Sequence, residues 1–164
     1  FAVLVPSLGY SADDLAGALK EGKTSLSFRL RHEQVDDDAF VNDANASTLR
    51  TRLSYTSSQW RKLDLLVEFD HVGHLLDERF NDTRNGNGTF PTVVDPKGAD
   101  LNQAAVRYRT DGFTATAGRQ RILLDNQRFI GGVGWRQNEQ TYDLWPGCRR
   151  TSSSTDPRPP FAEY

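Results

Sequence analysis

The sequence contains no methionine, one cysteine and no long run of apolar residues. The single Cys148 cannot form a disulfide within the chain, and it excludes a metal site built from several thiols. No stretch approaches the ~20 consecutive apolar residues of a membrane-spanning helix, so a helical membrane protein is excluded. Acidic and basic residues number 22 and 20, and this balance gives no support to a nucleic-acid-binding protein. Hydrophobic residues make up only 37% of the 164 residues, which still allows membrane-spanning strands of ~10 residues that are polar on one face.

The first twelve residues, FAVLVPSLGYSA, are apolar and uncharged, unlike the sequence that follows. Residues 1–12 are typical of the rear of a secretory signal peptide, which ends in small residues. A short apolar strand is the alternative, and Tyr10 is unusual beside a cleavage site. A chain that starts at Phe1 rather than Met is predicted to be processed or partial. Asp13–Lys23 then has the composition of a short helix, with acidic residues at its start and glycine near its end.

From residue 24 onward, apolar and polar residues alternate with a period of two, which predicts strands with one apolar and one polar face. In the first run Leu26, Phe28 and Leu30 alternate with serine and arginine. The alternation recurs at residues 47–57, 61–72, 102–110 and 113–118, and a further run begins near residue 140. Short turns at 57–60 and 110–112 alternate with long segments at 36–46, 73–100 and 119–137 that are rich in Gly, Asn and Asp. Such an order of short and long connections is expected of an outer-membrane β-barrel.

The polar faces of these runs carry regularly placed arginines: Arg29, Arg31, Arg50, Arg52, Arg107 and Arg109. In a soluble β-sandwich, which shows the same alternation, they would be solvated exterior residues. A secreted β-sandwich that binds acidic polysaccharide is therefore the alternative to a barrel. In the lumen of a barrel, Asp64, Glu68 and Asp70 on the same polar face would pair with some of the arginines.

Sequence patterns for catalysis and metal binding are weak. Glu68 and Asp70 lie two residues apart on a predicted strand, roughly 6.6–7 Å, a spacing that suits an inverting glycosidase, but both belong to the repeated polar pattern. His71 and His74 lack a clear third metal ligand, and no Asp-rich loop follows the twelve-residue calcium pattern. No phosphate-binding loop or nucleophile elbow is present. We therefore expect no catalytic residue, no metal site and no cofactor, and a protein that is not an enzyme.

The last 21 residues, 144–164, break the alternation. They hold four of the seven prolines and the cysteine, and proline is unfavourable inside a sheet. The sixth run is therefore expected to fail after Asp143. A frameshift in the coding DNA or a cloning artefact would produce such a change, and a disordered linker is the alternative.

Several phrases of residues 22–143 resemble the alginate-export family of bacterial outer-membrane porins. They include SFRLRHEQVDDDAF, DANASTLRTRLSY, LLVEFDHV and FPTVVDPKGADLNQAAVRY. The most specific is GRQRILLDNQRFIGGVGWRQNEQTYD, a long signature that is not expected by chance. The resemblance covers about three quarters of the chain and corresponds to the N-terminal part of a family member.

The resemblance implies an all-β fold, an antiparallel up-and-down transmembrane β-barrel, of which residues 13–143 supply about five or six strands. It implies a channel in the outer membrane of a Gram-negative bacterium, surrounded by lipid, that passes anionic or polar small solutes or polysaccharide, with alginate and related carboxylated compounds as examples. The six arginines would line the pore and bind anions, because a guanidinium stays charged and matches a carboxylate. The segment 119–137 would form a constriction loop, since infolded charged loops set selectivity in channels. The candidates there are Arg119, Arg121, Asp125, Asn126, Gln127, Arg128, Arg136 and Gln137.

For both sets of residues a structural role is the alternative. The arginines would then form ion pairs with neighbouring strands. Asp125 and Arg128 would pin the loop to the barrel wall.

Overall fold

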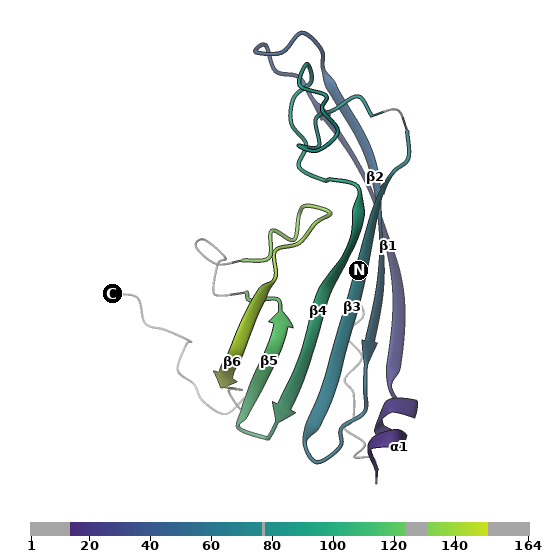
Figure 1. The fold of residues 1–164 in the computed structure, drawn as a ribbon. Coiled ribbons are helices and arrows are strands. Elements are labelled where there is room, and N and C mark those ends of the chain that lie inside the picture. The colour runs from purple at the N-terminus through teal and green to yellow at the C-terminus, as the bar shows by residue number, and fades with distance from the viewer. Residues whose placement is uncertain (1–13, 77, 124–130, 151–164) are drawn as a thin grey trace, which may run out of the picture.

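The computed structural model describes residues 14–76, 78–123 and 131–150. Within these residues the chain forms a single antiparallel sheet of six strands, which pair in sequence order, and a short helix at one end (Figure 1). The elements are α1 (Leu15–Lys20), β1 (Lys23–Val35), β2 (Ala44–Thr56), β3 (Leu63–His74), β4 (Gly98–Arg109), β5 (Phe113–Gln120) and β6 (Tyr142–Arg150). The predicted all-β, up-and-down antiparallel fold is confirmed.

The described strands all belong to one layer, so the alternative of two packed sheets is wrong for this part of the chain. β1 and β6 stand at the two ends of the strand order, and the sheet is not closed within the described residues. No helix in the same residues is long and apolar enough to cross a bilayer.

One face of the sheet is apolar and exposed. Leu26, Leu53, Phe69 and Leu101 follow one another across β1 to β4, each opposite its neighbour in the register. All four are exposed, and Leu30 on β1 reaches 68%. An exposed apolar row of this length on strands with alternating polarity is the arrangement expected of a surface that faces lipid.

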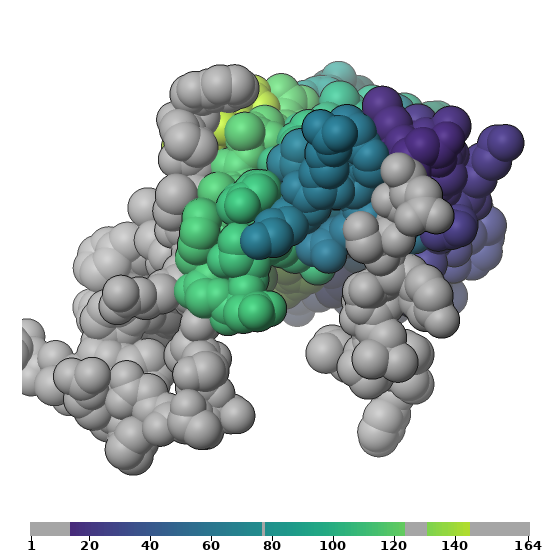
Figure 2. Space-filling model, turned by 90° about the horizontal axis from the view of Figure 1, so that it is seen from below, coloured from purple at the N-terminus to yellow at the C-terminus, as the bar shows by residue number. Residues whose placement is uncertain are grey.

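The short turns lie together at one end of the sheet. Seen from that end, the chain passes from α1 through the β2–β3 turn to the β4–β5 turn across the molecule (Figure 2). The predicted helix is present: Asp14 caps it by accepting a hydrogen bond from the Gly17 N–H at 2.6 Å. Tyr55 on β2 donates its hydroxyl hydrogen to the Leu19 carbonyl at 2.5 Å, which fixes the helix to the sheet.

The long connections lie at the opposite end (Figure 1). There Ala44 and Ala46 on β2 form a buried apolar cluster with Phe80 and Val93 from the β3–β4 connection. The core of the described residues is therefore at this end rather than across the middle of the sheet. Such a placement suits a sheet whose middle contacts lipid on one side and polar groups on the other.

β6 is longer than the sequence predicts. The expectation that the strand fails after Asp143 is wrong, because β6 continues to Arg150. Thr116 on β5 faces Gly147 and Gly118 faces Leu144, so the ladder has an irregularity opposite Pro146. A bulge on the last strand tolerates proline, because a backbone N–H is not required there.

The expected signal-peptide remnant at 1–12 and the tail beyond residue 150 lie outside the described residues. Both expectations stay predictions.

Candidate functional site

The opposite face of the sheet is polar and charge-paired. Arg52 on β2 faces Asp70 on β3 in the register, and its Nε and Nη2 atoms donate to the two Asp70 carboxylate oxygens at 2.7 and 2.6 Å. Ser54 donates to Glu68 at 2.7 Å. Nearer the short turns, Asp64 accepts from Arg107 and pairs with Arg109, each at 2.6 Å. The expected pairing of the strand carboxylates with the arginines is therefore present.

A β-bulge adds amide groups to this face. The β3–β4 register shifts between Glu68 and Phe69, so Asn102 is an extra residue on β4. In a regular strand, consecutive side chains point to opposite faces. Here Asn102 and its neighbour Gln103 both donate to the same Glu68 oxygen, at 2.8 and 3.1 Å. The bulge thus gives Glu68 two amide donors where an unbroken strand would supply one.

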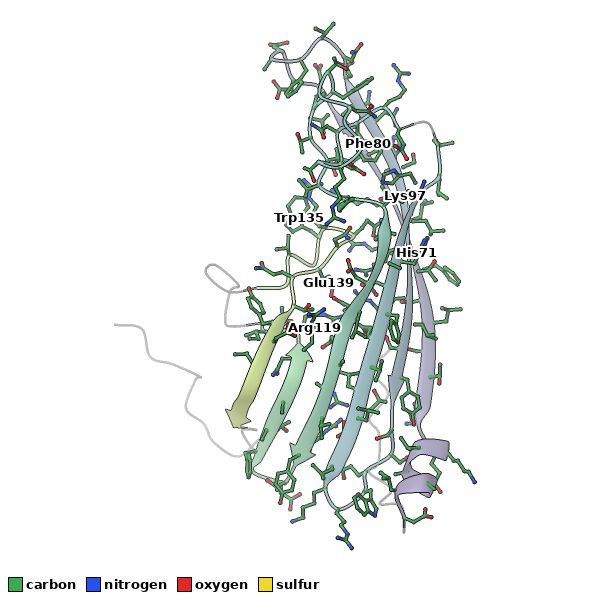
Figure 3. The ribbon with its side chains drawn as sticks, in the orientation of Figure 1. His71, Phe80, Lys97, Arg119, Trp135 and Glu139 are labelled. Atoms are coloured by element: carbon green, nitrogen blue, oxygen red, sulfur yellow. The ribbon has the colours of Figure 1, made fainter. Side chains whose placement is uncertain are left out.

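Residues 131–141, from the connection between β5 and β6, fold across the polar face (Figure 3). Gln137 is fully buried, and its amide nitrogen donates to the Thr48 hydroxyl at 2.9 Å. Its backbone N–H donates to Asp95 at 2.8 Å. Arg29 donates to the carbonyls of Gly134, Trp135 and Arg136 at 2.7, 3.0 and 3.2 Å. These bonds hold the segment against β1 and β2.

Glu139 is the central carboxylate of this contact and lies between the folded segment and the sheet (Figure 3). Its side chain is 8% exposed and lies 3.0 Å from Arg50, 3.1 Å from Arg52 and 2.5 Å from Arg121. Arg121 also contacts Glu68. One carboxylate from a distant segment therefore neutralises arginines from the sheet and from the end of β5. Removing one partner of an ion pair with so little water around it is strongly destabilising, because the other charge is left buried and unpaired.

A second charged cluster lies nearer the long connections. Arg31 and Arg136 both contact Glu33, and both approach Asp95, at 2.9 and 3.9 Å. The Asp95 side chain is almost completely buried. Two arginines and two carboxylates thus balance one another beneath the β3–β4 connection.

The structure assigns contacts to all six arginines predicted to line the pore. Arg29 binds backbone carbonyls, and the other five pair with carboxylates: Arg31, Arg50, Arg52, Arg107 and Arg109. Of the loop candidates, Arg121, Arg136 and Gln137 join the polar face. Arg119 instead pairs with Asp143 across β5 and β6 at 2.9 Å. Asp125, Asn126, Gln127 and Arg128 lie outside the described residues.

Some residues of the site were not predicted from the sequence. Glu139 and Asp95 come from long connections, and only the structure shows that they contact the arginine network. Glu33 continues the alternation of Arg29 and Arg31 on β1, so the period of two could have placed it on the polar face. Asn102 stands at an apparently apolar position of the alternation, because the bulge is invisible to a period-two pattern. Glu139 lies within GRQRILLDNQRFIGGVGWRQNEQTYD, the most specific phrase of the family resemblance, and this is the sequence signal that points to the segment.

His74 contacts Glu78 and the Asp95 carbonyl, each at 3.0 Å. In the part of the chain that the structure describes, no three His, Cys, Asp or Glu side chains are placed to hold a metal ion.

The fold and the site define a class of structure: a wall of antiparallel strands, apolar on one face and arginine-rich on the other, with a connecting segment folded over the charged face. The chain belongs to the alginate export family, whose model matches residues 22–150. This family comprises outer-membrane β-barrel porins, and the match extends to the end of β6. No curated protein and no solved structure matches the chain.

Proposed function

We propose that this chain forms part of the wall of an outer-membrane channel that passes anionic or polar solutes, such as alginate or related carboxylated compounds. The observation that carries the proposal is the segment 131–141, which folds over the arginine-rich face and is fixed there by buried polar contacts. A segment in this position narrows the space in front of the polar face. Together with Arg121 it forms the constriction, and charged groups at a constriction set selectivity.

The charge of this face favours anions. Its bonded network contains eight arginines and six carboxylates, and Asp100, opposite Asp70 in the register, adds a seventh carboxylate to the face. Within the network, the excess of arginines over carboxylates has two sources. Asp64 is shared by Arg107 and Arg109, and the contacts of Arg29 within the described residues are to carbonyl oxygens. A cleft with an excess of one sign raises the local concentration of the opposite ion.

A catalytic role for the strand carboxylates has little support. Glu68 accepts hydrogen bonds from Ser54, Asn102 and Gln103 and pairs with Arg121. Asp70 is held by both donors of Arg52. Carboxylates that are committed in this way fix the wall of a channel and are not placed to protonate or attack a substrate.

Closure of the channel requires more strands than the six that the described residues form. An unpaired strand edge is not viable in the hydrocarbon region, and bacterial barrels have ~8 strands or more. We infer that further strands complete the barrel.

Planar-bilayer recordings test the proposal with two samples. The 164-residue chain alone is expected to give no steady conductance. A chimera, in which residues 22–150 replace the corresponding strands of a full-length family channel, is expected to conduct anions in preference to cations. Arg29→Gln in the chimera should lower that preference, because it removes a positive charge whose contacts within the described residues are to carbonyl oxygens. Arg61→Gln, in the short β2–β3 turn, is the matched control and should leave it unchanged.

Steady channels from the chain alone would overturn the inference that more strands are needed. A folded chimera that prefers cations would overturn the proposed solute class.

A further inference from the structure

Trp135 is an exposed aromatic residue on the folded segment, with 57% of its surface accessible (Figure 3). Its backbone is rigidly held. Arg29 binds its carbonyl and those of both its neighbours, and the Arg136 N–H donates to the Val133 carbonyl at 2.9 Å. Two residues later, Gln137 is fully buried. The segment therefore presents a large flat ring on the charged side of the sheet without burying it.

Two guanidinium groups lie against this ring. The central carbon of Arg136 is 4.1 Å from the ring centroid and that of Arg31 is 5.3 Å from it. Both arginines contact Glu33 and approach Asp95, so they lie together. More than half of Trp135 stays open. Arg136 lies 3.2 Å from Glu33 and 3.9 Å from Asp95 through its Nη1 atom, and a guanidinium carries five N–H donors in all.

A flat aromatic surface beside fixed guanidinium donors matches one ligand chemistry closely. A pyranose ring has a face of C–H groups, which packs on an aromatic ring, and a rim of hydroxyl groups, which needs hydrogen-bond partners. When the sugar is a uronic acid, its carboxylate fits the planar fork of an arginine. The four charged groups around Trp135 balance one another, so the ring contributes to binding through stacking and Arg136 contributes the recognition of the acid.

We propose that Trp135 is a stacking platform for one sugar unit of an acidic polysaccharide, and that Arg136 binds the carboxylate of that unit. This inference rests on the proposed function, since it names the residues that would contact a passing solute. Trp135 then acts by direct contact, whereas Arg29 and Gln137 are positioning residues that hold it in place.

Binding to the chain folded in detergent micelles tests the platform, with folding verified by circular dichroism. Trigalacturonic acid is titrated into a variant that carries Trp60→Phe and Trp145→Phe, so that the fluorescence comes from Trp135. A saturable change in emission is expected. In calorimetry on otherwise unchanged chains, Trp135→Ala should weaken binding by about tenfold, while Trp135→Phe should retain most of the affinity.

Two controls separate stacking from general effects. Trp60 also lies beside an arginine, with the Arg61 central carbon 4.9 Å from its ring centroid, but it stands in the short β2–β3 turn. Trp60→Ala should leave the affinity unchanged. Arg136→Gln should weaken the binding of trigalacturonic acid more than the binding of the neutral trisaccharide maltotriose.

Folded chain that binds neither sugar, or that binds equally well after Trp135→Ala, would overturn the platform. Equal losses for both sugars on Arg136→Gln would overturn the role of that arginine. The assay needs no channel, so binding without conductance in the chimera would refute the proposed function and leave the platform standing.

Discussion

Glu139→Gln is expected to lower the free energy of unfolding by about 3–5 kcal/mol, because it removes the shared partner of three arginines. The carboxylate lies within 3.1 Å of Arg50, Arg52 and Arg121, and its side chain is 8% exposed. The amide keeps the shape but loses the charge, which leaves the guanidinium groups less compensated in a site with little water. Urea unfolding in detergent micelles, followed by circular dichroism, measures the loss.

Glu78→Gln is the matched control for this prediction. Glu78 also forms an ion pair, with His74 at 3.0 Å, but its side chain is 37% exposed. Exposed pairs contribute about 1 kcal/mol or less, so this variant should unfold close to the unmodified chain. If both variants lost the same stability, the account of a buried network under residues 131–141 would be wrong.

Gly118→Ala is expected to destabilise the sheet by about 3 kcal/mol or more, because the backbone at this residue leaves no room for a side chain. Gly118 has a φ of +114°, and a Cβ added there would lie 2.3 Å from the Ala104 carbonyl oxygen. The close atom belongs to the backbone of β4, so it cannot move without breaking the β4–β5 ladder. The urea midpoint should fall, and less chain should fold into micelles.

Gly112→Ala is the control for the same chemical change. Gly112 lies in the β4–β5 turn, and an added Cβ there would meet no atom within 4 Å. Its stability should change little. A Gly118→Ala variant as stable as Gly112→Ala would contradict the observed backbone at the β5 irregularity.

The strands could be predicted because their alternation is local. In each of β1 to β5, apolar residues recur at every second position with polar residues between them. The pleat of a strand places the two kinds on opposite faces. The turns between β2 and β3 and between β4 and β5 were also visible in the sequence. β6 could not be predicted in this way, since Pro146 counts against a strand until the irregular ladder opposite it is known.

The candidate site was only partly predictable. The alternation placed Arg50 and Arg52 on the polar face, which is a local property. The contact of Glu139 with these arginines depends on the path of the long β5–β6 connection. That path produces no periodic pattern in the sequence. The double contact of Glu68 with Asn102 and Gln103 depends on a bulge, which also breaks no visible pattern.

The most direct test of the account asks which face of the sheet contacts lipid. Spin labels are attached one at a time at Leu26, Ser27, Phe28 and Arg29 of the channel chimera in lipid vesicles, with Cys148→Ser as background. Frequent collision of a label with oxygen indicates that it faces lipid, and frequent collision with a water-soluble nickel complex indicates that it faces water. We predict that Leu26 and Phe28 are accessible to oxygen, while Ser27 and Arg29 are accessible to nickel. Accessibility without this alternation, or with the two faces exchanged, would contradict the account.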